Sequence, residues 1–248
     1  MNLKTLASIA ISAATAVQGY NFVRLNKTDA VLLVVDHQLG LSQLVRDFST
    51  VEFRQSILAH AAIGNLFDLP TILTTSADTG TVCFCPTHYN GPNGALPKEV
   101  IAMHPNAPFI HRQGEVDAWD NADLRAAVEA TGKKQVILGG ITTEVCTAFL
   151  ALSLVEAGYE VFANTEASGT FSDRLAADAN RRMEQAGVHL MGLFGIVMDL
   201  MRDWRNTPGT AEVLPFLDTF LVPYSLVARD HGYAIDNGTL VPGEAKIL

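Results

Sequence analysis

The sequence predicts an α/β protein built on a parallel β-sheet that helices cover on both sides. Short apolar runs rich in β-branched residues recur along the chain, helix-like patterns separate them, and the alternation repeats through most of its 248 residues. Near-continuous apolar strands are typically buried on both faces, as in parallel sheets. Repeated strand–helix alternation builds right-handed βαβ units. With 48% hydrophobic residues, the chain can bury the core of one large domain.

The predicted strands are the apolar runs, at residues 30–35, 71–75, 108–112, 134–140, 159–164 and 188–192. The predicted helices lie between and after them, at residues 51–68, 121–131, 144–157, 173–186 and 193–204. The first helix follows a capping box formed by Ser49 and Glu52. Three others end at Gly132, Gly158 and Gly187, as glycine commonly terminates helices.

The two ends of the chain differ from this body. Residues 1–19 combine an early lysine, an apolar alanine-rich run and small residues, which is typical of a secretory signal peptide cleaved after Ala16 or Gly19. We therefore predict secretion, with a cytoplasmic protein as the alternative if this leader is retained. Residues 20–205 form the predicted domain. Residues 206–248, rich in Pro and Gly with weak periodicity, are predicted to form an arm that packs on the domain or on an oligomer partner.

The charge and cysteine content exclude several classes of function. A net charge of −9 argues against nucleic acid and anionic membranes as main partners, since both require a basic surface. No apolar stretch in the predicted domain is long enough to span a membrane. Three cysteines cannot form a disulfide framework, and at least one thiol must be free.

Polar residues follow three of the predicted strands. They are DHQ at 36–38, HRQ at 111–113 and the segment GGITTEVC at 139–146. Reactive groups in such sheets collect beyond the carboxyl ends of the strands, so these side chains are expected to meet. DHQLGLS after the first strand lacks the glycine pattern of a dinucleotide-binding loop, and no cofactor is predicted.

Cys146 is the candidate nucleophile. It falls in the first turn of a predicted helix, where free N–H groups and the helix dipole are expected to lower the pKa of the thiol. The same N–H groups could hold an oxyanion. Gly139 and Gly140 are expected to let the chain bend sharply before it. The alternative is a buried structural cysteine.

Asp36 and Arg112 are the candidate charged partners of this thiol. Burial at a strand end would raise the pKa of Asp36 towards that of a general base, unless the residue only caps a turn. Gln38 would point to the same side if the strand continued. Arg112 would hold the thiolate and the carboxylate together, unless it extends to solvent at an edge. Because neighbours on a strand face opposite sides, only one of His111 and Arg112 can reach the site.

Cys83, Cys85 and His88 form a second group of chemically reactive residues. Their spacing is irregular for a metal site, so we predict no metal and interpret the segment as a flexible insertion at the mouth of the site.

Several motifs together resemble the isochorismatase-like cysteine hydrolases, and most closely the YcaC-like subgroup, whose physiological substrate is unassigned. The motifs are DHQ, TILTTS, AWDNADL, GKKQVILGGITTEVCTAF, ASGTF and MRDWRN, from about Phe22 to Asn206. The resemblance implies a three-layer α/β/α sandwich with a six-stranded parallel sheet. It also implies a homo-oligomer, either a tetramer or an octamer.

The resemblance also implies a catalytic triad of Asp36, Arg112 and Cys146. A non-proline cis peptide is expected at Ile141–Thr142, and the N–H groups of Thr142 and Cys146 would form the oxyanion hole. The chain departs from the family amidases at Arg112, where they carry lysine. It has no lysine between Lys98 and Lys133, and arginine cannot readily give up a proton. The insertion between Gly80 and Gly91 is also longer than the family pattern.

The hypothesis is hydrolysis of a small amide through an acyl-thioester on Cys146. Predicted substrate-binding residues are Gln38, Trp119, Ile141 and Phe149, and the small-molecule substrate itself is not determined by the sequence. One alternative is a papain-like pair of Cys146 with His37 or His111. Another is a non-catalytic oligomer of the same fold with a redox-active or inert thiol.

Overall fold

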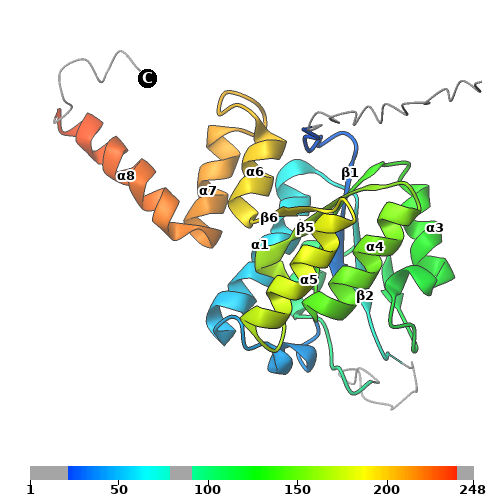
Figure 1. The fold of residues 1–248 in the computed structure, drawn as a ribbon. Helices are drawn as coiled ribbons and strands as arrows, with labels where there is room; N and C mark the ends of the chain where they lie inside the picture. Colours follow the sequence, from blue (N-terminus) through cyan, green and yellow to red (C-terminus); the bar gives the residue numbers. More distant parts are fainter. Residues whose placement is uncertain (1–21, 79–90, 239–248) are drawn as a thin grey trace, which may run out of the picture.

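The structure confirms the predicted fold class. The computed structural model describes residues 22–78 and 91–238 and contains a six-stranded, all-parallel sheet with strand order β3-β2-β1-β4-β5-β6 (Figure 1). The strands are β1 (Ala30–Val35), β2 (Thr71–Thr75), β3 (Phe109–His111), β4 (Gln135–Gly140), β5 (Glu160–Asn164) and β6 (His189–Met191). Each lies within a predicted strand.

The central strands are buried on both faces, as their apolar runs predict. Every residue of β1, β2 and β4 is buried. β3 and β6 differ from the prediction, because they are three residues long and only partly buried. They form the two edges of the sheet, where each strand has a neighbour on one side only.

Helices cover both faces of the sheet and give the three layers. They are α1 (Thr50–Phe67), α2 (Lys98–Met103), α3 (Ala122–Ala130), α4 (Ala148–Glu156), α5 (Asp173–Gln185), α6 (Leu193–Met201), α7 (Thr210–Phe220) and α8 (Val222–Asp236). Alternate residues of β1 enter opposite cores. Leu32 packs with residues of α1, α6 and α7, whereas Leu33 packs with residues of α3, α4 and α5.

Helix termini largely follow the sequence signals. The capping box of Ser49 and Glu52 is present at the start of α1. Gly132, Gly158 and Gly187 all have positive φ after α3, α4 and α5. The predicted helix at 144–157 is different, because it starts with a π-helical turn at Thr143–Thr147 and continues as α4.

The predicted arm consists of two helices with different surroundings. α7 buries Val213, Phe216 and Leu217 in the core on the α1 side of the sheet, so the body of the protein extends past the predicted boundary at residue 205. α8 follows α7 and projects away from the body (Figure 1). The sequence analysis predicted neither helix, because the apolar residues in this region show only a weak helical periodicity.

The predicted leader, residues 1–19, lies outside the described residues. Within them, Val23 packs against the core, and backbone groups of Arg24 and Leu25 form hydrogen bonds with the side chains of Gln135 and Asp199. None of the helices in residues 22–78 and 91–238 is long and apolar enough to cross a membrane.

The strand order creates a switch point at the carboxyl ends of the central strands. The chain moves outward from β1 through β2 to β3, and then returns to β4 on the other side of β1. In such sheets the connections diverge between these two central strands, beyond their carboxyl ends, and ligands bind there. Val35 and Gly140 are paired at this point, so the segments that follow them begin side by side.

Candidate active site

Asp36 lies directly beyond β1 at this switch point. Its N–H donates to the Thr74 carbonyl (3.0 Å), which continues the ladder with β2. Its φ of +55° is unusual for a residue with a side chain and ends the strand. The carboxylate is fully buried and accepts a hydrogen bond from the guanidinium of Arg112.

Arg112 reaches Asp36 from the end of β3 and is itself fully buried. Its Nε donates to the Thr74 hydroxyl (3.1 Å), and its Nη1 donates to the Glu115 carbonyl. The guanidinium therefore has a protein partner on each side, which holds its orientation. The neighbouring His111 points elsewhere and binds Asp78 (2.6 Å), in agreement with the expectation that only one of the two reaches the site.

Cys146 lies opposite, in the π-helical turn that follows β4. The Thr147 N–H donates to the Thr142 carbonyl (3.1 Å), five residues back, and this wider turn surrounds the thiol. The residue is 9% exposed, and its thiol interacts with the Asp36 carboxylate, the Arg112 charge and the Thr142 N–H. The three predicted triad residues thus come together, although they derive from three separate strands.

The pKa of the Cys146 thiol is raised, contrary to the sequence expectation. Burial is the main cause, and the charge of Asp36 beside the thiol raises the pKa further. The Arg112 charge and the Thr142 N–H act in the opposite direction but are weaker. The expected lowering of the thiol pKa was based on the helix terminus alone. It did not include the burial of the thiol or the carboxylate that follows another strand.

The pKa of Asp36 is also raised, because desolvation outweighs the ion pair with Arg112. Cys146 and Ser76 lie close enough to the carboxylate to act as weak donors that lower its pKa. Yet Oδ1 accepts no well-aligned hydrogen bond from the described protein groups.

The loop between β4 and Cys146 contains the expected cis peptide at Ile141–Thr142. Ile141 is fully buried and pairs with Gly169, whose carbonyl accepts the Thr143 N–H (3.2 Å). The loop that carries Thr142 is therefore held against the segment after β5.

Gly139 and Gly140 allow neighbouring atoms to pack closely against β4, and they do not form the sharp bend expected from the sequence. Both lie within β4 and neither has a positive φ. A Cβ on Gly139 would lie 2.9 Å from the Ala167 Cβ, and one on Gly140 would lie 2.8 Å from the Val35 carbonyl oxygen. Both contacts are too short for any larger residue.

Gln38, predicted to bind substrate, is used by the protein itself. Its side-chain amide donates to the carbonyls of Ser76 (3.1 Å) and Gly94 (2.7 Å), and its oxygen accepts from the Ser76 N–H (2.8 Å). It therefore fixes the segment after β2 next to Asp36. Ser76, which the sequence analysis did not single out, lies at the site because it directly follows β2.

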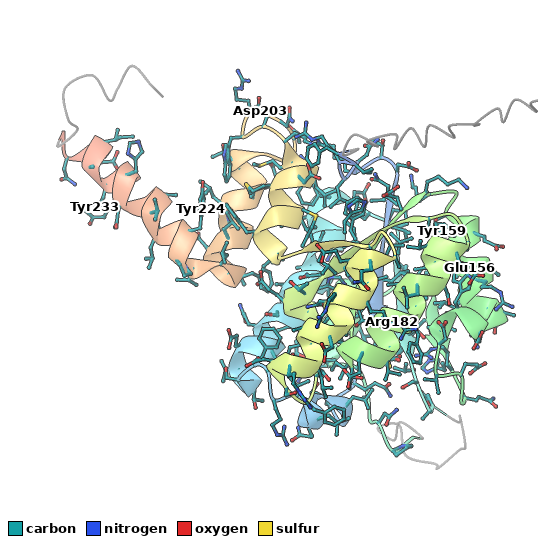
Figure 2. All side chains as sticks on the ribbon, in the orientation of Figure 1. Glu156, Tyr159, Arg182, Asp203, Tyr224 and Tyr233 are labelled. Atoms are coloured by element: carbon teal, nitrogen blue, oxygen red, sulfur yellow. The ribbon has the colours of Figure 1, made fainter. Side chains whose placement is uncertain are left out.

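Trp119 and Phe149 each contact another side chain of the protein. The Trp119 ring packs edge-on against Tyr159, which directly precedes β5 at the amino end of that strand, opposite the site (Figure 2). Trp119 is therefore poorly placed to bind substrate in the same chain. The ring centre of Phe149 lies 5.6 Å from the guanidinium carbon of Arg182 on α5, and its contact with substrate stays a prediction.

The other histidine considered as a base, His37, is buried away from the thiol. Its Nε2 lies 2.7 Å from the Ala167 carbonyl, and its ring packs against Phe53 and His60. Burial, followed by the nearby His60, lowers the pKa of His37 to about 3, so its ring is neutral. His37 links the end of β1 to the loop behind Ile141.

No candidate metal site accompanies the thiol in the described part of the chain. The described residues contain no group of three or more His, Cys, Asp or Glu side chains that could hold a metal ion. Cys83, Cys85 and His88 lie outside the described residues. A cavity of about 670 Å³ lies beside β6 and α6, far from the chemistry, and we assign no function to it.

The fold and the site together define the class of this protein. It is a parallel α/β sandwich whose candidate site combines the thiol of one cysteine with a carboxylate and a guanidinium at the switch point of the sheet. Residues 30–193 match the isochorismatase domain, and the chain belongs to the isochorismatase family.

The most informative relatives carry the name YcaC. The Escherichia coli (strain K12) protein described as probable hydrolase YcaC is 49% identical over 185 residues, which are 75% of this chain and 84% of the relative. The structure of YcaC from Pseudomonas aeruginosa with hexane-2,5-diol and covalent acrylamide is 45% identical, with a TM-score of 0.78 over 86% of this chain and 99% of that one. The structure of E. coli YcaC, described as an octameric hydrolase of unknown specificity, is 44% identical, with a TM-score of 0.78 over 86% and 98%.

These relatives make the chain a YcaC-like hydrolase of the isochorismatase family. The similarity also extends beyond the family domain. The structural match with the P. aeruginosa protein covers 86% of this chain, which is about 213 of its 248 residues. The domain match ends at residue 193, so the structural match must include residues of the C-terminal helices.

Proposed function

We propose that this hydrolase cleaves a small amide, or a related C–N bond, with Cys146 as nucleophile and Asp36 as general base. The observation that carries the proposal is the contact of the Cys146 thiol with a buried carboxylate whose pKa is raised. A carboxylate with a raised pKa accepts a proton more readily at neutral pH than an exposed one.

In the proposed first half-reaction, the thiol proton moves to Asp36 as sulfur attacks the amide carbon. The N–H groups of Thr142 and Cys146 would stabilise the oxyanion of the tetrahedral intermediate. Asp36 then returns the proton to the leaving nitrogen, and ammonia or an amine departs from the acyl-thioester. In the second half-reaction, Asp36 takes a proton from water as its oxygen attacks the thioester. The C–S bond then breaks, the acid leaves, and Asp36 passes the proton to the Cys146 sulfur, which restores the thiol.

Arg112 provides a fixed positive charge during both steps. The site holds a carboxylate and gains negative charge on sulfur and then on the substrate oxygen, and the buried guanidinium offsets this charge. Because arginine keeps its proton, we assign proton transfer to Asp36 alone. Gln38 and Ile141 hold the loops that carry Asp36 and Thr142.

The raised pKa of the Cys146 thiol fits this scheme. A thiol that stays protonated until substrate arrives is protected from adventitious oxidation. The P. aeruginosa relative holds covalent acrylamide, an electrophile that alkylates thiols, which supports a reactive nucleophile in this subgroup.

The test is ammonia release from a panel of small primary amides by the wild type and by Cys146→Ala and Cys146→Ser. Both variants should lose turnover, and iodoacetamide should no longer modify the peptide that contains residue 146. The chain has two further cysteines, so Cys83→Ser/Cys85→Ser is the matched control and should retain both properties. Retained hydrolysis in Cys146→Ala would refute the proposal.

The two rival hypotheses from the sequence have less support. His37 and His111 are hydrogen-bonded to Ala167 and Asp78, and neither is among the groups that shift the pKa of the Cys146 thiol. A non-catalytic role has less support because it does not explain why a buried carboxylate with a raised pKa lies beside the thiol.

We also propose that the chain assembles with copies of itself, as its octameric E. coli relative does. The proposed partners are therefore a small-molecule substrate and other copies of this chain, without nucleic acid or membrane.

A further inference from the structure

The last helix, α8, has an unusual number of exposed apolar side chains. Ten large apolar residues are exposed in the described part of the chain, and five of them lie on this one helix: Val222, Leu226, Val227, Tyr233 and Ile235. Of the 15 residues in α8, only Ser225 is buried. Soluble proteins rarely expose such a cluster unless it is a contact surface.

Two side chains in the first eight residues of α8 contact other helices and loops of the chain. Tyr224 stacks on Trp204 of the loop between α6 and α7 (5.9 Å between ring centres) and packs against Phe194 of α6 (4.8 Å). Arg229 pairs with Asp218 of α7, with 2.9 Å between Nε and Oδ1. These contacts fix the direction of α8, and the helix then projects away from the body, with Tyr233 on its distal half (Figures 1 and 2).

Three of the apolar residues form a row. Val222, Leu226 and Tyr233 are separated by four and seven residues, which places them on the same side of an α-helix. Tyr233 is 75% exposed and Leu226 is 52% exposed. The helix, about 22 Å long, therefore presents these three apolar side chains on one side, and Arg229, which lies between Leu226 and Tyr233 on that side, pairs with Asp218 of α7.

The charges on α8 indicate what kind of partner it fits. The helix carries Arg229, Asp230 and Asp236, a net charge of −1, whereas the whole chain carries −9. Two copies of an acidic protein repel each other least where their local charge is low. A surface for a strongly charged partner would instead carry charges of one sign.

We propose that the apolar side of α8 is a contact surface that binds a second copy of this chain. This inference rests on the proposed self-assembly and names the surface that mediates it. Burial of the row between copies removes the exposed apolar area that a single chain leaves in water.

The first experiment compares the mass in solution of the wild type and of Leu226→Ser/Tyr233→Ser by chromatography with light scattering. The wild type should form an oligomer, and the variant should give a species of at most half that mass with an unchanged circular dichroism spectrum. Val51→Ser is the matched control, because Val51 is 82% exposed at the start of α1, far from α8 in the sequence, and should change nothing.

The outcomes separate the two proposals. A monomeric wild type would overturn the self-assembly itself. An oligomeric wild type with an equally large variant would overturn the role of α8 and leave the assembly standing.

A second experiment places the photo-cross-linker benzoylphenylalanine at position 233. Illumination of a mixture of isotopically light and heavy chains should give a product of twice the chain mass that joins one light and one heavy chain. Cross-links confined to a single chain, including those to the segment after residue 238, would overturn the proposal.

Discussion

Arg112 and Asp36 form an ion pair in which both side chains are fully buried. Such a pair is weak evidence for stability, because desolvation of two charges can exceed their attraction. The hydrogen bonds of Arg112 to Thr74 and Glu115 offset part of this desolvation. The position of the pair beside the thiol suggests that function maintains it.

Removal of the guanidinium should destabilise the protein strongly. Arg112→Met would leave Asp36 buried without its cation, and we expect the free energy of unfolding in urea to fall by about 3–5 kcal/mol. Arg112→Lys keeps the charge but loses the bonds from Nε and Nη1, so its loss should be clearly smaller. Equal losses in the two variants would mean that hydrogen bonding, and not charge, is the important contribution.

Substitution of the proposed base should separate thiol ionisation from turnover. Asp36→Asn removes the charge that raises the pKa of Cys146, so alkylation of the residue-146 peptide should reach its half-maximal rate at a lower pH than in the wild type. Amide turnover should nevertheless fall by about 10²–10⁴-fold, because the proton acceptor is lost. If turnover fell but the pH of half-maximal alkylation rose, the charge of Asp36 would not be a cause of the raised pKa of the Cys146 thiol.

At the scale of elements, the site depends on how closely β4 approaches its neighbours. Gly139 and Gly140 allow the end of β4 to lie against Ala167 and the Val35 carbonyl. The Thr147 hydroxyl donates to the Gly140 carbonyl (3.0 Å), which couples the strand to the turn that carries Cys146. The position of the nucleophile is therefore set by backbone packing between strands.

Gly140→Ala should disturb stability and activity together. The new Cβ would meet the Val35 oxygen and, at 3.2 Å, the Thr147 hydroxyl, so we expect a loss of about 1–3 kcal/mol in urea unfolding and reduced turnover. Gly114→Ala is the matched control, because nothing lies within 4 Å of its Cβ position. Similar effects from both substitutions would show that close packing at β4 is not the cause.

At the scale of the whole molecule, buried neutral histidines make stability depend on pH. Burial lowers the pKa of His37 to about 3 and that of His60 to about 4, from a usual value of 6.5. Below pH 6.5 the unfolded chain binds protons at these residues while the folded chain does not. Stability must therefore fall as the pH falls, from about 6.5 towards 4.

The two histidines together should contribute a slope of about 2.7 kcal/mol per pH unit in this window. His60→Gln should remove about half of it, measured as the difference in urea unfolding free energy between pH 6 and pH 5. Above pH 7 the wild type and the variant should show the same pH dependence at these sites. An unchanged slope in the variant at acid pH would exclude His60 as a source.

The ends of the chain illustrate two limits of inference from sequence. Cleavage after Ala16 or Gly19 and secretion stay predictions, and such cleavage would leave the contacts of Val23, Arg24 and Leu25 in place. The predicted C-terminal arm consists of α7 and α8, and neither helix was predicted from the sequence. The exposed apolar side of α8 weakens the periodic signal of a helix that packs on its own chain.

Much of this protein is determined by its sequence alone. The positions of the strands and of α1, α3, α4, α5 and α6, the α1 capping box and the location of Asp36, Arg112 and Cys146 at strand ends follow from local patterns of apolar and polar residues. Only the tertiary structure decided the rest: the raised pKa of the thiol, the use of Gln38 as a clamp, the close packing of Gly140, and the packing of Trp119 against Tyr159. The physical reason is that these properties depend on which distant segments of the chain become neighbours. The local pattern defines each strand, whereas the strand order and register of the folded sheet determine which strands and loops meet.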